Sequence, residues 1–271
     1  DPDYTEAYFG LGQVYSEFGK TGEAIGYFQK ALDLDPDLKD ARYFLAALQK
    51  PDASSQDHID HVTGMFDDFA ERFEDTLTNK LEYNTPSLIR DIVSAHLEPP
   101  SSGINIFDAG CGTGLCGPLF RDIARLLVGA DLSPKMIEQA KLKNVYDELA
   151  VGDIALTLDQ QKRLYDLIIA ADVFVDMGDL APVFETCYRA LVPAGIFAFS
   201  TESGAEEKYV LRGSGRYAHA DDYIRELAEE SGFELVSQQS CILRQDFGKP
   251  VSGTLHVLRK AGSEPESNTS L

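Results

Sequence analysis

The chain has 271 residues, of which 44% are apolar, and its formal net charge at pH 7 is −21. This acidic balance argues against a nucleic-acid partner, because binding phosphates requires a basic surface. No apolar run approaches the roughly 20 residues that a transmembrane helix needs, so no membrane partner is expected. The four cysteines show no paired framework, which indicates reduced thiols and a protein of the cytoplasm.

Residues 5–36 predict two helices joined by a glycine-containing turn at 19–22. Small residues such as Gly12 and Ala24 allow the helices to approach closely, and aromatic residues such as Phe28 fill the space between them. The pattern resembles one 34-residue tetratricopeptide (TPR) repeat. Residues 39–49 predict a further helix, which Pro51 ends.

The resemblance to a TPR repeat implies a module that docks a protein or peptide. Arrays of this kind usually need about three repeats to bury a core, and residues 1–3 resemble the end of a preceding repeat. We therefore expect a truncated array, whose part at 1–50 mainly packs on the rest of this chain.

Polar residues at 51–60 predict a linker, a second domain is expected over 61–260, and the polar tail 261–271 is expected to be disordered. Phe66, Phe69 and Phe73 recur at helical spacing on an amphipathic helix, where core packing and substrate binding remain equally open. A helix is expected at 86–97.

The stretch Ile104-Asn-Ile-Phe-Asp108-Ala-Gly110-Cys-Gly112-Thr-Gly114 reads as a strand, a glycine-rich turn and the start of a helix. This arrangement suits a nucleotide-like cofactor at the carboxyl end of a parallel strand. Residues 112–117 also match G-x-G-x-x-G, the dinucleotide pattern. Asp108 would repel a pyrophosphate, whereas S-adenosylmethionine (SAM) carries sulfonium and ammonium charges and no phosphate. The loop therefore favours SAM over NAD(P).

A second apolar run ends in Asp131, near the spacing expected for an acid that binds ribose hydroxyls. Ser133 and Pro134 then open a helix as its N-cap and first residue. An NAD enzyme would also place an acid here, so Asp131 indicates an adenosine with a free ribose more than it indicates SAM. Cys111 is interpreted as a small side chain that fills space in the loop. No second cysteine or histidine lies beside it at the spacing of metal ligands, so no metal is expected.

Strand and helix alternate after the glycine loop. Strands are expected at 104–108, 126–131, 148–151, 166–171 and 195–200, and helices at 115–125, 134–142, 179–191 and 220–231. This alternation predicts an α/β fold with a doubly wound, mostly parallel sheet. Residues 233–244 and 253–260, joined by 245–250, predict a terminal hairpin whose last strand is antiparallel to its neighbours.

The segments FDAGCGTGL, GADLSPKMIEQA, VGDI at 151–154 and YDLIIAADVF at 165–174 resemble, in this order, the motifs of class I SAM-dependent methyltransferases. The resemblance covers about residues 60–260 and implies a seven-stranded Rossmann-like fold. The segment 65–73 resembles the one that helps cover the cofactor there. The cofactor-binding residues implied are Tyr83, Asp108, Gly110, Cys111, Gly112, Gly114, Asp131, Leu132, Met136, Asp153, Ile154, Ala171, Asp172 and Val173.

The resemblance also divides the cofactor among these residues. Asp108 and the glycines would hold the methionine part, Asp131 the ribose, and Asp153 the adenine. Asp153 is equally open to a role as a turn residue, and Met136 to core packing.

Methyl transfer from SAM is an in-line displacement, for which a protein supplies mainly proximity and alignment. A general base helps when the acceptor is a hydroxyl or a protonated amine. His219 is our first candidate, followed by Asp172 and Asp176. The acidic helix start after His219 favours its protonated form, and the glycine-rich turn 213–215 suggests a mobile substrate lid.

The sequence is therefore compatible with three functions. The first is a SAM-dependent methyltransferase that acts on a small molecule or a protein, with the TPR segment for docking or packing. An oxygen or carbon acceptor on a small molecule is preferred, because no Asn-Pro-Pro-Tyr-type motif follows the fourth strand. The alternatives are an NAD(P)-dependent oxidoreductase and a non-catalytic TPR adaptor with a nucleotide-binding fold.

Overall fold

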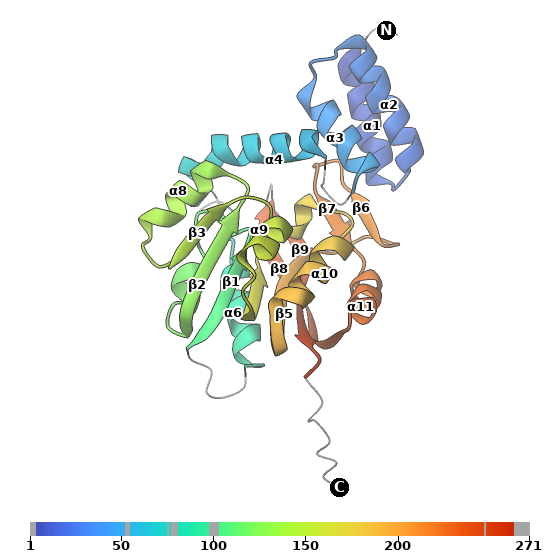
Figure 1. The fold of residues 1–271 in the computed structure, drawn as a ribbon. Coiled ribbons are helices and arrows are strands. Elements are labelled where there is room, and N and C mark those ends of the chain that lie inside the picture. Colours follow the sequence, from blue (N-terminus) through green and yellow to red (C-terminus); the bar gives the residue numbers. More distant parts are fainter. Residues whose placement is uncertain are drawn as a thin grey trace.

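The computed structural model describes residues 4–51, 55–74, 76, 81–97, 103–246 and 248–262. Figure 1 shows a group of N-terminal helices standing beside a sheet flanked by helices. The expected tail 261–271 lies almost entirely outside the described residues. Within the described ranges, no helix has the length and apolar character needed to cross a membrane.

The N-terminal group consists of α1 (Thr5–Glu17), α2 (Thr21–Leu34) and α3 (Lys39–Gln49). A Cβ on Gly12 would come within 2.5 Å of the Phe28 ring, so glycine is what allows α1 and α2 to pack this closely. Phe28 also stacks on Phe44 of α3, with ring centroids 4.9 Å apart. The small and aromatic residues singled out in the sequence therefore form the core of this part, as predicted.

Seven strands form one sheet in the order β3-β2-β1-β4-β5-β9-β8. Their bounds are β1 (Ile104–Ala109), β2 (Ala124–Asp131), β3 (Glu148–Val151), β4 (Tyr165–Ala170), β5 (Leu191–Glu202), β8 (Phe233–Asp246) and β9 (Lys249–Lys260). The first five are parallel, and β9 runs antiparallel to both β5 and β8. The predicted fold class, including the antiparallel last strand, is confirmed.

Helices bury both faces of the sheet. On one face lie α9 (Ile154–Gln161), α10 (Ala181–Ala190) and α11 (Asp221–Glu230), which pack on a cluster that includes Phe107 and Ile168. The other face packs on α6 (Thr85–Ser94) and α7 (Gly117–Phe120) through Ile106 and Leu167. Neighbouring residues of one strand thus enter opposite cores, which is why the strands read as unbroken apolar runs.

One helix is much shorter than predicted. The helix expected at 115–125 is only α7, because the chain turns back to the sheet after Phe120. Arg121 donates hydrogen bonds to the carbonyls of Val145 and Ala124, and the carbonyl of Ile123 accepts from Gly103 and Ile104. The contacts with Val145, Gly103 and Ile104 join distant segments, which no local pattern predicts.

The predicted linker 51–60 also differs from the structure. Helix α4 (Gln56–Phe69) begins inside it, since the hydroxyl of Ser55 accepts a hydrogen bond from the backbone N–H of His58 and caps the helix. Figure 1 shows α4 running across the top of the sheet, from α3 at one end to α8 (Pro134–Leu142) at the other. It therefore roofs the edge where the parallel strands end.

A short hairpin of β6 (Tyr209–Leu211) and β7 (Tyr217–His219) lies between the N-terminal helices and the sheet. Neither strand was predicted. The hydroxyls of Tyr43 and Tyr217 donate across this boundary to the carbonyls of Gly215 and Ala47, at 2.6 and 2.5 Å. The N-terminal helices are therefore fixed against the hairpin, in agreement with the packing role expected for them in this chain.

Candidate functional site

A pocket of about 240 Å³ lies at the carboxyl ends of the parallel strands, under α4. Open α/β sheets bind ligands at this edge. Eleven of the sequence-predicted residues line it: Tyr83, Gly110, Gly112, Asp131, Leu132, Met136, Asp153, Ile154, Ala171, Asp172 and Val173. They come from the segments that follow β1, β2, β3 and β4, and from the stretch before α6.

The glycines of the loop after β1 have positive φ angles and close neighbours. A Cβ on Gly110, whose φ is 63°, would lie 2.6 Å from a methyl carbon of Val173. On Gly114, with φ 85°, it would meet the ring of Tyr146 at 2.9 Å. Glycine is thus required here for packing as well as for backbone conformation.

Asp131 stands at the end of β2 with both carboxylate oxygens held by backbone groups. The N–H of Gly112 donates to Oδ2 at 2.9 Å, and the N–H of Ser133 donates to Oδ1 at 2.8 Å. Burial raises its pKa, and these two hydrogen bonds oppose the rise. Each oxygen keeps a further lone pair, so this fixed carboxylate can also accept from ligand hydroxyls.

Asp108 lies behind the glycine loop, outside the pocket lining. Its side chain is 1% exposed, and the hydroxyl of Tyr146 donates to Oδ2 at 2.6 Å. Burial raises the pKa of Asp108 to about 7, although the Tyr146 hydrogen bond lowers it. Cys111 and Gly114 also belong to the loop without lining the pocket, so the structure places these three predicted residues behind the pocket wall.

Two residues whose roles the sequence left open have a structural contact and also line the pocket. The side chain of Asp153 accepts from the backbone N–H of Leu156 at 2.9 Å and caps α9 while it lines the pocket. Met136 is 1% exposed and packs in the interior, yet it also reaches the pocket wall. At both positions the structural contact is therefore established, and the predicted contact with a cofactor stays a prediction.

The roof of the pocket comes from α4 and the residues after it. Phe66, Phe69 and Phe73, whose roles the amphipathic pattern left open, line it. The carboxylate of Asp67 accepts from the hydroxyl of Ser133 at 2.5 Å and from the backbone N–H of Lys135 at 3.2 Å. These bonds hold the roof to the start of α8.

Asp172 lines the pocket but is held in a buried ion pair. Its φ is 60°, in the left-handed region that a non-glycine residue rarely adopts. Nη1 of Arg244 donates to both of its oxygens, at 2.8 and 2.7 Å, while Nη2 of the same arginine binds Glu202. Arg244 is 2% exposed and was not predicted from sequence. Asp172 is thus a weaker candidate for a general base than its position suggested.

Asp176 faces the pocket from the short helix η2 (Phe174–Asp176). Burial raises its pKa to about 7; Arg216 lowers the pKa, and the carboxylates of Asp172, Asp131 and Glu202 raise it. A carboxyl group with this pKa can accept or release a proton near neutral pH. Asp176, predicted from the sequence as a candidate base after His219, therefore lies in the pocket.

The structure places His219 elsewhere. It is 1% exposed, lies outside the pocket lining, and Nε2 donates to the carbonyl of Gly178 at 3.2 Å. The protonated form predicted for it is wrong, because burial lowers the pKa of His219 to about 4 and outweighs the acidic helix start. The turn 213–215, expected to be a mobile lid, is hydrogen-bonded to the N-terminal helices in this structure: Gln13 and Glu17 of α1 and Tyr43 of α3 bind its backbone.

Comparison with known proteins confirms the class of protein. Residues 107–199 match the methyltransferase domain family, and residues 5–38 match the tetratricopeptide repeat family. The two segments that resembled these families in the sequence are therefore the ones that match the family models, and the resemblance is confirmed.

Individual relatives cover part of the chain. The ubiquinone biosynthesis O-methyltransferase of Chelativorans sp. (strain BNC1) is 33% identical over 48% of this chain and 59% of its own length. The protein of the same name from Nitrobacter winogradskyi is 27% identical over 54% of this chain and 62% of its own. The chain thus spans less than two thirds of these curated relatives.

A solved structure shows the same fold. The magnesium protoporphyrin IX methyltransferase of Synechocystis PCC 6803, crystallised with bound SAM, superposes with a TM-score of 0.57 at 18% identity. The match covers 77% of this chain and 99% of that chain. At this identity the likeness concerns the architecture alone.

Proposed function

We propose that the chain binds SAM in the pocket under α4 and transfers its methyl group to an oxygen or carbon of a small molecule. The observation that carries the proposal is the acidic lining, in which Asp131, Asp153 and Asp176 stand against the one arginine among the described lining residues, Arg216, while Asp172 is paired with Arg244 behind the wall. Such a wall attracts a cofactor with a sulfonium and an ammonium group and disfavours a pyrophosphate. The NAD(P) alternative is correspondingly weaker.

The residues present fit SAM. Asp131 would accept hydrogen bonds from the ribose hydroxyls with its remaining lone pairs, and Leu132, Met136 and Ile154 offer an apolar wall to the adenine. The glycine loop would hold the methionine part. When bound, SAM supplies a methyl group already activated by the positive charge on sulfur.

The chain itself would supply alignment and proton transfer. Asp176 is our proposed proton acceptor, because it faces the pocket and its pKa is raised to about 7. It would take the proton of an acceptor hydroxyl as the oxygen attacks the methyl carbon. The roof formed by α4 would exclude water from the reacting atoms. An oxygen acceptor is also supported by the relatives, which are named O-methyltransferases.

The functional units that we propose are the TPR-like helices at 1–50 and the methyltransferase domain at 61–260. The match to the TPR family supports a protein contact as a second role of the helices. Their packing on the hairpin supports the first role, which is to complete the catalytic unit.

Calorimetric titration with S-adenosylhomocysteine (SAH), the product of methyl transfer, tests the proposal, with NAD as the control ligand. We expect SAH to bind, and Asp131→Ala to weaken binding by about 10-fold or more, since charge-assisted hydrogen bonds are lost. Asp159→Ala is the matched control, because Asp159 pairs with Arg189 on the surface. Binding of NAD alone would overturn the proposal, and no binding of either ligand would favour the adaptor.

A further inference from the structure

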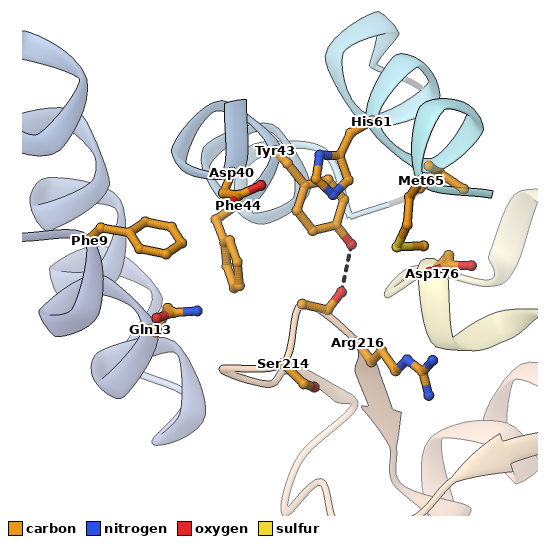
Figure 2. A pocket seen from close by; sticks show the side chains of 12 residues that line it. Phe9, Gln13, Asp40, Tyr43, Phe44, His61, Met65, Asp176, Ser214 and Arg216 are labelled. Atoms are coloured by element: carbon orange, nitrogen blue, oxygen red, sulfur yellow. Dashed lines mark hydrogen bonds between the residues drawn. The ribbon is translucent and has the colours of Figure 1, made fainter. Parts of the chain in front are cut away.

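A second cavity, of about 250 Å³, lies between the N-terminal helices and the rest of the chain (Figure 2). Its walls come from α1, α3, α4 and the turn between β6 and β7. Val62, Met65, Asp176 and Arg216 line both this cavity and the pocket under α4. The two spaces are therefore neighbours with a shared wall, and that wall carries the proposed proton acceptor together with an arginine.

Arg216 is the one arginine among the described residues that line either space. Figure 2 shows Arg216 and Asp176 both at the end of the cavity away from Phe9. The guanidinium of Arg216 lies 3.8 Å from the carboxylate of Glu202, and its side chain is 39% exposed. Because Glu202 is hydrogen-bonded directly by Arg244, it neutralises Arg216 only in part. The positive charge of Arg216 is therefore available to Asp176.

Charged and titratable groups face Asp176 from two sides. The sheet side supplies the carboxylates of Asp131, Asp172 and Glu202, and the helix side supplies Asp40, Tyr43, His58 and His61. Burial raises the pKa of Asp176 to about 7, the charge of Arg216 lowers it, and the three sheet-side carboxylates raise it. Burial also lowers the pKa of His61, so that this ring adds no positive charge near neutral pH. Arg216 is therefore the neighbour that favours the ionised carboxylate.

Helix α3 holds both chain neighbours of Arg216. The hydroxyl of Tyr43 in α3 donates to the carbonyl of Gly215 at 2.6 Å. The hydroxyl of Tyr217 donates to the carbonyl of Ala47 in α3 at 2.5 Å. Since Gly215 precedes Arg216 and Tyr217 follows it, these two bonds set the position of the Arg216 backbone.

Helix α1 holds the rest of the hairpin. Gln13 donates to the carbonyl of Gly213 at 2.9 Å, and the N–H of Gly213 donates to Glu17 at 2.7 Å. The buried hydroxyl of Ser16 donates to the carbonyl of Leu211 at 2.6 Å. The hairpin β6–β7 thus takes its position from two of the N-terminal helices, and the place of Arg216 depends on their docking.

We propose that the N-terminal helices control the proposed proton acceptor through Arg216, which is a positioning residue of the site. When the helices are seated on the hairpin, the guanidinium of Arg216 lies at the shared wall. There it favours the ionised form of Asp176, which is the form that accepts a proton. When the helices are displaced, Arg216 moves with the turn, and Asp176 ionises only at a higher pH. The inference rests on the part that Asp176 has in the proposed function.

NMR titration of isotope-labelled aspartate carboxyl groups in the full chain tests the inference without SAM or an acceptor. The signal of Asp176 is the one that Asp176→Asn lacks. We expect Arg216→Gln to raise the midpoint of this titration by about one pH unit, because an attractive but partly exposed charge is lost. Arg216→Lys keeps the charge and should undo most of the change. Arg225→Gln is the matched control and should leave the midpoint in place, since Arg225 pairs with Asp222 on the surface.

A double variant tests the part of the helices. Tyr43→Phe removes the hydrogen bond to Gly215 and should raise the midpoint by a smaller amount than Arg216→Gln does. Added to Arg216→Gln, it should cause no further change, because Tyr43 acts through Arg216. Tyr8→Phe alters a ring stacked on Tyr27 within the helices and should leave the midpoint in place.

The other outcomes each overturn a step. An unchanged midpoint in Arg216→Gln would show that Arg216 does not act on Asp176. No change in Tyr43→Phe, or equal changes with and without Arg216, would show that the helices do not act through Arg216. A midpoint of about 4 in the parent chain would leave no raised pKa for the helices to control. SAH binding is measured separately, and its absence would overturn the proposed function while the titration results stand.

Discussion

Asp176 combines a raised pKa, about 7, with a place on the wall shared by the two cavities. Only its ionised form can take a proton from an acceptor hydroxyl. We therefore expect kcat/KM for a hydroxyl acceptor to rise with pH and to level off above about 7. Asp176→Asn should lower the rate by about 10²- to 10⁴-fold and remove this pH dependence.

Asp179→Asn is the matched control for Asp176→Asn. Asp179 lies three residues further along, and its carboxylate accepts from the N–H of Ala181 and the hydroxyl of Tyr223 instead of lining either cavity. Its variant should keep the pH profile of the parent. An Asp176→Asn enzyme with an unchanged profile would remove Asp176 from the mechanism.

Asp108 affects the stability of the fold because its pKa, like that of Asp176, is raised by burial. Its folded-state pKa of about 7 exceeds the ordinary value of 3.8, so the folded protein retains a proton that the unfolded chain releases between these pH values. Its contribution to the free energy of unfolding therefore falls as pH rises from about 4 to 7 and is constant above. Asp108→Asn removes this fall, which we expect to be about 4 kcal/mol at most.

Urea unfolding of both proteins across this pH range measures the difference. The wild type should lose stability relative to Asp108→Asn as pH rises. Parallel curves would show that Asp108 is ionised in the folded protein, held so by Tyr146 despite its burial and the nearby charge of Asp131.

At the scale of elements, the hairpin β8–β9 supports the site through Arg244. This arginine, 2% exposed, reaches from β8 to Asp172 after β4 and to Glu202 at the end of β5. Arg244→Met would leave two poorly solvated carboxylates without their partner. We expect the free energy of unfolding to fall by about 3–5 kcal/mol, the usual cost of breaking a buried ion pair.

Arg163→Met is the control for Arg244→Met, because Arg163 pairs with Glu148 in an exposed position. Its loss should cost about 1 kcal/mol or less in chemical denaturation. Comparable losses in both variants would mean that the Arg244 pairs contribute no more than surface pairs.

Elements with local signals were predictable from the sequence. The strand that ends in Asp108, the glycine loop and the capped start of α8 follow from apolar runs, glycines and Ser133, and the structure has them all. The early end of α7 and the hairpin β6–β7 depend on contacts with distant segments, so no local sequence pattern predicted them. The same holds within the site, where Arg216 and Arg244 follow no motif.

At the scale of the whole molecule, the pocket under α4 and the second cavity differ in how they are encoded. Most sequence-predicted residues around the pocket under α4 lie directly after parallel strands, which the topology brings to one edge. The second cavity joins residues as far apart as Phe9 and Arg216. It depends on how the N-terminal helices dock, and docking is set by shape and by scattered hydrogen bonds.

This docking should make the helices and the sheet unfold together. Tyr43 and Tyr217 donate from buried positions to the carbonyls of Gly215 and Ala47, so each hydroxyl satisfies a backbone group at the boundary. Tyr43→Phe and Tyr217→Phe would each leave a carbonyl without this partner. We expect a loss of about 1–3 kcal/mol in the free energy of unfolding for each variant.

Hydrogen exchange followed by mass spectrometry distinguishes joint from separate unfolding. In the wild type, peptides from α1–α3 and from β1–β5 should reach the same maximal protection, and both should gain protection when SAH is added. Each Tyr→Phe variant should lower protection on both sides of the boundary, whereas Tyr8→Phe, which alters a ring stacked on Tyr27 within the helical pair, should leave the sheet unaffected. If α1–α3 exchanged rapidly while the sheet stayed protected, the helices would be an independent module that folds apart from the sheet.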